Sequence, residues 1–418
     1  MKFIGIDIGT TAICGVLCED GKIISLRNEN SDAFINTCNE WEKIQDAEKI
    51  IYIAKRILNE LIDEAQGDIS AIGVTGQMHG ILYYDVEGRA VSPLYTWQDR
   101  RGDLPYKSTT YAKHLGSFAG YGNVTDFYNR ENGIVPRSAA SYCTIHDYFV
   151  MHICENNEPL IHASDAASLG LYNAEKGCFE YPYSHMITEG FELAGSYRNI
   201  PVSVAIGDNQ ASVLATLDGE DELLVNVGTG SQVSLISEKI ITAENIEARP
   251  YFNRKYLIVG SALCGGRAYS LLKDFYRSLL CAVGEDTEDI YAVMARIVGD
   301  TTESSLRVDT RFDGTRQNPA VRGSISNIGV DNFNPKELTV GVLFGIIEEL
   351  YNMYTSIGIE KKKIVASGNG IRKNDTLKKI TAHVFGKEVR VSECIEEAAM
   401  GAVKYAAEAV KGMKNENK

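Results

Sequence analysis

Two short polar turns contain residues that could bind phosphate oxygens. The first, in the stretch DIGTT, places Gly9, Thr10 and Thr11 between two apolar runs. The second, in the stretch VGTGS, repeats this layout far downstream with Gly228, Thr229, Gly230 and Ser231. Glycine lets a backbone approach a phosphate group closely, and backbone N–H groups and hydroxyls can donate hydrogen bonds to its oxygens. One such turn is also typical of an ordinary hairpin, whereas a pair favours two phosphate-binding loops.

Two aspartates end apolar runs close to these turns, where a carboxylate is costly unless it has a partner. Asp7 ends the first apolar run, and Asp208 lies in GDNQAS, directly before the helix-like ASVLATL. A magnesium ion on bound phosphate groups would provide Asp7 with such a partner. Asp208 has two interpretations, a helix N-cap or a group that acts in the chemistry, and its place before the second turn favours the chemical role.

The segments around the first turn have the pattern of an α/β protein. Asp20 and Gly21 form a hairpin signal between two strand-like runs, which predicts an antiparallel three-strand meander. Helical spacing and then a further strand, which ends in GQMHG, follow the meander. The predicted strands cover residues 2–8, 13–18, 22–26 and 69–75, and the predicted helix covers residues 44–65.

The meander pattern starts again in the second half of the chain. Strands are predicted at 223–227, 232–236 and 256–261, and the weaker periodicity of 103–199 predicts peripheral helices and loops. Two later helices have start signals, one at Asn334 and Pro335 and one before residues 398–409. We therefore expect two domains, 1–200 and 201–418.

Composition excludes several classes of function. The chain has 418 residues, 44% of them hydrophobic, and a formal net charge of -14, which argues against nucleic acid or an anionic membrane surface as a partner. Its nine cysteines form no C-x-x-C pair, so reduced thiols and a cytoplasmic location are expected. No signal peptide and no apolar run long enough to span a membrane are present in the sequence.

Nine motifs along the chain resemble the FGGY carbohydrate kinases, which belong to the actin-like and hexokinase-like ATPase superfamily. The motifs are DIGTT, GQMHG, TWQDRR, GDNQAS, VGTGS, GGRAYSLL, FDGTRQNPAVRGSISNI, SGNGIRKN and EAAMGAVKYAA. The resemblance implies two actin-like (ribonuclease H-like) α/β domains with a nucleotide and sugar cleft between them. Residues 1–200 would then form the sugar-binding domain, and residues 201–418 the nucleotide-binding domain.

The same resemblance implies transfer of the γ-phosphoryl group of ATP, with Mg²⁺, to a primary hydroxyl of a ketose. Asp208 would be the general base, and Asp7 and Asp208 would hold the metal ion. The residues of the two turns would bind the phosphate groups. The residues expected beside the adenosine are Gly265, Gly368, Gly370 and Asn374.

A sugar requires short polar groups and often an aromatic ring in its binding wall. The expected substrate contacts are Gln77, Met78, His79, Trp97, Asp99, Asp208 and Asn209. His79 and Trp97 have structural alternatives, a satisfied histidine and a core indole. Arg311, Arg316 and Arg322 are either a solvated loop with surface ion pairs or a contact to phosphate, and the first reading is favoured.

The acceptor is the least determined part of the prediction. Within the family, the details of TWQDRR, GDNQAS and FDGTR favour sedoheptulose, with sedoheptulose 7-phosphate as the product. D-Xylulose, another ketose or polyol, or a small signalling molecule are the alternatives, and a homodimer is one expected assembly. A non-catalytic actin-like nucleotide switch is the alternative of another class, although such a switch would need neither Asp208 nor a polar sugar wall.

Overall fold

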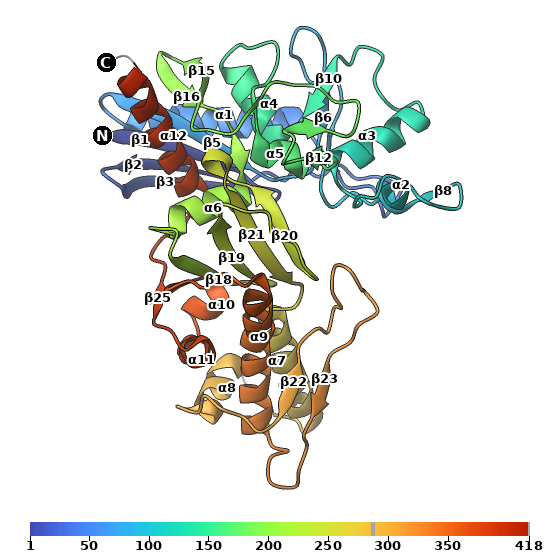
Figure 1. Cartoon of the computed structure of the whole chain (residues 1–418), viewed down its shortest axis with the longest axis vertical. Helices are drawn as coiled ribbons and strands as arrows, with labels where there is room; N and C mark the ends of the chain where they lie inside the picture. Colours follow the sequence, from blue (N-terminus) through green and yellow to red (C-terminus); the bar gives the residue numbers. More distant parts are fainter. Residues whose placement is uncertain (286–288, 417–418) are drawn as a thin grey trace. The chain divides into compact units, whose positions relative to one another are not determined.

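The computed structural model describes residues 1–285 and 289–416 (Figure 1), and these form two compact units. The first unit contains Met1–Ala215, Arg249–Lys255 and the chain from Cys394 onward. The second unit contains Thr216–Ala248 and Tyr256–Glu393. Within the described residues, no helix combines the length and the apolar character that crossing a membrane requires.

The first unit is built on a mixed sheet with the order β15-β16-β5-β1-β2-β3, and β17 also pairs with β5. β1, β2 and β3 form the expected antiparallel meander, while β5, β16 and β17 continue the sheet in parallel. Their bounds are Lys2–Ile8, Ala12–Glu19 and Lys22–Asn30 for β1 to β3, and Ile69–Gly76, Leu193–Tyr197, Ile200–Ser203 and Ile206–Gly207 for β5, β15, β16 and β17.

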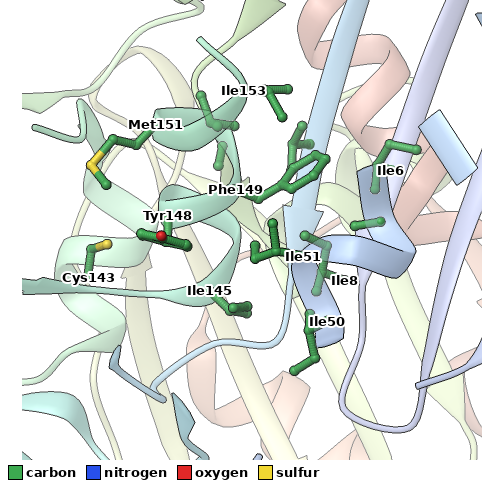
Figure 2. Packing of buried hydrophobic residues seen from close by; sticks show 14 of the residues in the cluster. Ile6, Ile8, Ile50, Ile51, Cys143, Ile145, Tyr148, Phe149, Met151 and Ile153 are labelled. Carbon is green, nitrogen blue, oxygen red and sulfur yellow. The ribbon is translucent and has the colours of Figure 1, made fainter. Parts of the chain in front are cut away.

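Alternating side chains of β1 give this sheet two different buried faces. Ile4, Ile6 and Ile8 point to the face covered by α1 (Ala47–Glu64) and α4 (Ile145–Ile153). Figure 2 shows Ile6 and Ile8 among the apolar side chains of these two helices. Asp46 caps the start of α1 by accepting a hydrogen bond from the backbone N–H of Lys49.

The other face of the sheet is covered by the last helix, α12 (Glu397–Glu416). Glycines permit this close packing, because an added Cβ at Gly5 would lie 2.1 Å from the carbonyl oxygen of Ala399, and one at Gly73 2.0 Å from that of Ala402. Figure 1 shows α12 beside the first strands of this unit. The first and last elements of the chain therefore build one core.

Short elements complete the first unit around this sheet, and residues 103–199 contain short strands as well as the expected helices and loops. The helical ones are η1 (Arg101–Asp103), α2 (Tyr111–His114), α3 (Gly122–Glu131), α5 (Ala163–Ser168), α6 (Asp208–Thr216) and η2 (Phe252–Arg254). The strands are β4 (Ile44–Gln45), β6 (Leu82–Tyr84), β7 (Leu94–Tyr95), β8 (Pro105–Tyr106), β9 (Thr109–Thr110), β10 (Ser141–Cys143), β11 (Ile161–His162), β12 (Tyr172–Asn173), β13 (Cys178–Phe179) and β14 (Ile187–Thr188).

The second unit repeats the same sheet plan with the order β20-β21-β19-β18-β24-β25. β18 and β19 are antiparallel, as are β19 and β21, whereas β18, β24 and β25 are parallel. β18, β19, β21 and β24 thus correspond to β1, β2, β3 and β5. The strands are β18 (Glu222–Val227), β19 (Ser231–Ser237), β20 (Ile246–Pro250), β21 (Tyr256–Ala262), β22 (Arg307–Asp309), β23 (Ser324–Ser326), β24 (Lys363–Ser367) and β25 (Val389–Val391).

Five helices pack on this second core. They are α7 (Gly266–Ala282), α8 (Ile290–Val298), α9 (Pro335–Ile357), α10 (Asn369–Arg372) and α11 (Asp375–Phe385). The predicted start of α9 is confirmed, because Asn334 accepts a hydrogen bond from the backbone N–H of Glu337 and Pro335 is the first helical residue. The two meanders confirm the expected pair of actin-like α/β folds.

The compact units divide the chain differently from the expected domains 1–200 and 201–418. β16, β17 and α6 continue the first sheet beyond residue 200, so the first change of unit comes after Ala215. The C-terminal helix also belongs to the first unit, because the missing side chains of Gly5 and Gly73 let it pack on β1 and β5. A division of the chain by sequence order therefore differs from the division by packing, both after residue 200 and at the C-terminal helix.

Candidate active site

Three parallel strands of the first unit end at the same edge of the sheet. Asp7 pairs with Thr75 of β5, and β17 places Gly207 beside Gly76. The first polar turn, GQMHG and Asp208 follow these strand ends directly. In α/β sheets, ligands bind outside the carboxyl ends of parallel strands. The fold thus brings the predicted phosphate turn, part of the predicted sugar wall and the predicted base to one edge.

A polar network joins the first turn to two residues of the predicted sugar wall. The Thr10 hydroxyl donates to Gln77 Oε1 at 3.2 Å and accepts from the Trp97 indole N–H at 3.0 Å. Gln77 also donates to Gln45 Oε1 at 3.0 Å, and Gln45 donates to the Thr10 carbonyl at 2.7 Å. Trp97 is 42% exposed, so its ring is not a core indole.

Asp7 lies among carboxylates. Burial, and then the negative charges of Asp208 and Glu396, raise the pKa of Asp7 to about 7. Its Oδ1 atom is buried and has no hydrogen-bond partner among the described residues. A cation beside this oxygen would satisfy it, so Asp7 fits the predicted role near a metal ion.

Asp208 is the first residue of α6 and is only partly covered, so a substrate can reach it. Burial raises its pKa, while the charges of His146 and Arg249 and the backbone N–H of Asn209 oppose that rise. A carboxylate at the start of a helix is also favoured by the helix dipole. The side chain is thus accessible and fits the predicted role of a base.

Met78, His79 and Asn209 lie around this edge. An added Cβ at Gly207 would lie 2.7 Å from Met78 Cε, so Met78 packs directly on the strand that leads to Asp208. Asn209 Oδ1 accepts from Arg249 at 3.2 Å. Arg249 comes from a short segment distant in the sequence, which explains why sequence patterns did not predict it.

His79 has an unusual backbone and a fixed ring. Its φ is +73°, a left-handed conformation that is rare outside glycine and is common at functional sites. Its Nδ1 lies 2.8 Å from the Ser168 carbonyl, which can only accept, so Nδ1 carries the proton. The ring stacks on Tyr121 with centroids 4.3 Å apart. Tyr121 was not predicted, because a lone tyrosine has no sequence signal.

The Asp99 side chain is bonded to internal partners. Its carboxylate is fully buried and accepts from Arg101 Nε at 2.7 Å, from Arg101 Nη2 at 3.1 Å and from the backbone N–H of Lys43. The Arg101 guanidinium in turn lies over the Tyr95 ring at 4.3 Å. A carboxylate with these partners serves as an internal ion pair, and its predicted contact to substrate has no support in the geometry.

A second buried cluster, which sequence reasoning did not find, contains His146, Asp147 and Asp165. One potential ligand atom from each lies within 4.8 Å of the others, and His146 Nε2 lies 3.0 Å from Asp165 Oδ1 without hydrogen-bond alignment. Burial raises the pKa of Asp147 to about 8 and that of Asp165 well above its ordinary value, with the charge of Asp208 adding to the rise at Asp165. Burial lowers the pKa of His146. Burial thus disfavours the charged form of each of the three groups.

The second polar turn lines a cavity of about 1190 Å³ within the second unit. Gly228 and Thr229 form one part of it, and the predicted Gly368, Gly370 and Asn374 form another. Its apolar lining includes the stacked rings of Tyr269 and Tyr291, with centroids 5.5 Å apart, together with Leu271 and Ala295. A hollow with glycine-rich backbone at one part and aromatic rings at another fits a nucleotide.

Glycines near the second turn allow neighbouring backbone segments to pack closely against it. An added Cβ at Gly368 would lie 2.5 Å from the Val227 carbonyl oxygen, and one at Gly265 2.5 Å from Gly230. Gly265 packs behind the turn and is not part of the cavity lining, whereas Gly266 is. Ser231 is also buried, and its hydroxyl has no partner within the described part of the chain.

The three arginines of the FDGTR region take part in local contacts. Arg311 forms an ion pair with Asp309 at 2.6 Å, and Arg316 pairs with Glu247 at 3.4 Å. Arg322 donates to the carbonyls of Pro319 and Val321. These contacts agree with the favoured reading, a loop with surface ion pairs.

Comparison with known proteins decides the family. The model of the N-terminal domain of the FGGY family of carbohydrate kinases matches residues 2–108, and the model of its C-terminal domain matches residues 223–410. The chain belongs to the FGGY family of carbohydrate kinases. It is therefore a sugar kinase, a phosphotransferase with an alcohol group as acceptor, and the predicted resemblance is confirmed.

Individual relatives of this FGGY kinase are named for different sugars. Sedoheptulokinase from Mus musculus is 26% identical over 458 residues, which cover 96% of each chain. Xylulose kinase from Staphylococcus xylosus is 26% identical over 460 residues, covering 97% of this chain and 90% of the relative. The solved structure of a xyloylose kinase from Brucella ovis superposes with a TM-score of 0.83 at 21% identity, covering 99% of this chain and 91% of the other. The last comparison supports the fold.

Proposed function

We propose that this FGGY kinase transfers the γ-phosphoryl group of ATP to a primary hydroxyl of a ketose, with sedoheptulose as the favoured acceptor. The observation that carries the proposal is the common edge of β1, β5 and β17, where Asp7, GQMHG and Asp208 meet. The nucleotide would bind in the cavity beside the second turn of the other unit. The proposal thus assigns sugar recognition to the first unit and nucleotide recognition to the second.

Asp208 is proposed to orient the acceptor hydroxyl and take its proton. In a loose phosphoryl-transfer transition state this proton leaves late, so a carboxylate is a sufficient base and its positioning contributes strongly. The raised pKa of Asp208 brings it closer to that of the hydroxyl that loses the proton. Placement at the start of α6 fixes the direction of the side chain.

Asp7 and Asp208 are proposed to hold Mg²⁺, which would supply positive charge to the phosphate oxygens when bound. The buried, unpartnered Oδ1 of Asp7 supports this assignment. Backbone and hydroxyl groups of Gly9, Thr10 and Thr11 would bind phosphate oxygens from the first unit. The corresponding groups of Gly228, Thr229, Gly230 and Ser231 would do so from the second.

The sugar would contact the wall formed by Gln77, Met78, His79 and Trp97, with Asn209 next to the base. Gln77 and Trp97 are held through Thr10, and His79 is held by Ser168 and Tyr121, so the wall is rigid before substrate binds. Rigid polar groups in a site reject a sugar that leaves some of those groups without a hydrogen-bond partner.

An ADP-release assay with a panel of ketoses, aldoses and polyols tests this proposal. Sedoheptulose should give the highest kcat/KM, and Asp208→Asn protein prepared in parallel controls for contaminating kinases. A higher kcat/KM with D-xylulose, another polyol or a small diol would keep the chemistry and replace the acceptor. Nucleotide binding without ADP release for any acceptor would instead favour the nucleotide switch.

A further inference from the structure

Glu396 lies directly before α12, and its position is set by tight backbone packing. The helix rests on β1 and β5 at Gly5 and Gly73, and an added Cβ at Gly401 would lie 1.9 Å from the Ala211 carbonyl oxygen of α6. The Glu396 carbonyl accepts the backbone N–H of Met400 at 2.9 Å, so the residue is part of the first helical turn. α12 therefore carries Glu396 to a defined place in the first unit.

That place is beside Asp7. Asp7 and Cys14 are cross-strand partners in β1 and β2, and partners of this kind project from the same face of a sheet. The Cys14 thiol lies 3.5 Å from Glu396 Oε2. Cys14 packs in the cluster formed with α12, so Asp7, Cys14 and Glu396 share the face that α12 covers.

The charges around Asp7 are unbalanced. Two further carboxylates lie near Asp7: Asp208 follows β17, which pairs with β5 at Thr75 as Asp7 does, and Glu396 contacts the cross-strand partner of Asp7. Carboxylates held close together are unfavourable unless a cation compensates their charge. The unpartnered Oδ1 of Asp7 is a second, independent sign of a missing ligand. Three carboxylates around such a point are typical of a divalent cation with oxygen ligands.

We propose that Glu396 is a third ligand of the divalent cation site, together with Asp7 and Asp208. The inference rests on the proposed function, because it assigns a further residue to the cation of the same kinase. Glu396 would add one negative charge and one oxygen ligand from the face opposite to α1. It would also make cation binding depend on the packing of α12.

A helix cap is the competing role for Glu396, because a carboxylate near a helix N-terminus is favoured without any metal. The two roles predict opposite effects of Glu396→Gln, which keeps the size and removes the charge. A cap predicts a lower Tm with and without cation. A cation ligand predicts a higher Tm in EDTA, since repulsion is relieved, and a smaller rise of Tm on adding Mg²⁺.

Direct binding of Mn²⁺ to the full chain, followed by electron paramagnetic resonance, tests the ligand role independently of catalysis. We expect Glu396→Gln to weaken Mn²⁺ binding by about tenfold or more. Asp7→Asn should weaken it similarly. Glu408→Gln is the matched control, because Glu408 is on the same helix and pairs with Lys411 at the surface, and it should bind like the wild type. Glu396→Asp retains the charge on a shorter side chain and should give an intermediate affinity.

Wild-type Mn²⁺ affinity in Glu396→Gln, or equal losses of Tm in EDTA and in Mg²⁺, would overturn the inference. If Glu396→Gln does not fold, wild-type affinity in Glu396→Asp would overturn it. Turnover by the wild-type enzyme is measured separately with the acceptor panel. Unchanged Mn²⁺ binding alongside sugar turnover would reject Glu396 as a ligand and leave the kinase proposal standing. Mn²⁺ binding that depends on Glu396, without turnover of any acceptor, would support Glu396 as a ligand and reject the kinase proposal.

Discussion

The Trp97 indole donates its N–H to the Thr10 hydroxyl at 3.0 Å, and the same hydroxyl donates to Gln77 Oε1. One hydroxyl therefore links the predicted phosphate turn to two residues of the predicted sugar wall. We therefore expect the two proposed binding functions to be interdependent.

Thr10→Val, which keeps the shape and removes the hydroxyl, should lower kcat/KM for the sugar by about tenfold, since two hydrogen bonds are lost. Thr10→Ser retains the hydroxyl and should stay close to the wild type. Steady-state kinetics for sugar and for ATP measure the effect. Equal rates for Thr10→Val and the wild type would show that the network is not required.

Asp208→Asn should lower kcat by about 10³-fold, because the amide orients a hydroxyl but cannot accept its proton. Nucleotide binding should be retained, since the cavity that fits a nucleotide is formed by other residues. Single-turnover kinetics and calorimetry with a non-hydrolysable nucleotide separate the two effects. Near-normal turnover would remove Asp208 as the base.

His79→Asn should raise KM for the sugar by about tenfold and leave KM for ATP within about twofold, because a substrate contact is lost. Asparagine tolerates the left-handed backbone at this position, so the variant isolates the ring from backbone strain. Parallel effects on both KM values would instead assign His79 a structural role.

Gly401→Ala should destabilise the first unit by about 1–3 kcal/mol, since its Cβ would lie 1.9 Å from the Ala211 carbonyl oxygen. Gly412→Ala is the matched control on the same helix, where an added Cβ meets nothing within 4 Å. This control should be neutral or gain up to about 1 kcal/mol of helix stability. Denaturant unfolding measures both, and an equal effect would contradict the packing argument.

Asp7 should make the cation-free protein less stable as the pH rises. The folded protein raises the pKa of Asp7 from 3.8 to about 7, so it holds the proton more tightly than the unfolded chain across that interval. The free energy of unfolding should thus fall from about pH 4 to pH 7 through this group. Asp7→Asn should remove that part of the slope in EDTA, and parallel curves for the two proteins would refute the assignment.

Local sequence patterns predicted the strands well, because alternation and turn residues act over short distances. β1 has the predicted bounds, and the meander recurs at β18, β19 and β21. The polar turns and Asp208 were predicted because motifs mark them. Glu396, Tyr121 and the cluster around His146 were not predicted, because only packing between distant segments gives them their neighbours.

The same reason explains why the sequence did not predict the buried partners of Asp99 or the bounds of the two compact units. A carboxylate in a sugar-kinase motif has the same sequence signal whether it contacts substrate or, like Asp99, a buried arginine. The assignment of α12 to the first unit depends on glycines in β1 and β5 that lie hundreds of positions earlier. No local pattern around residues 398–409 contains that information.

The packing of α12 on β1 also has a consequence for synthesis on the ribosome. β1 is translated before α12 and cannot bury its Phe3 face until that helix has emerged. All residues of the second unit lie between these two segments, so it can complete its core earlier. The nascent first unit therefore exposes one apolar sheet face until α12 emerges, and we expect it to depend more on chaperones than the second unit does.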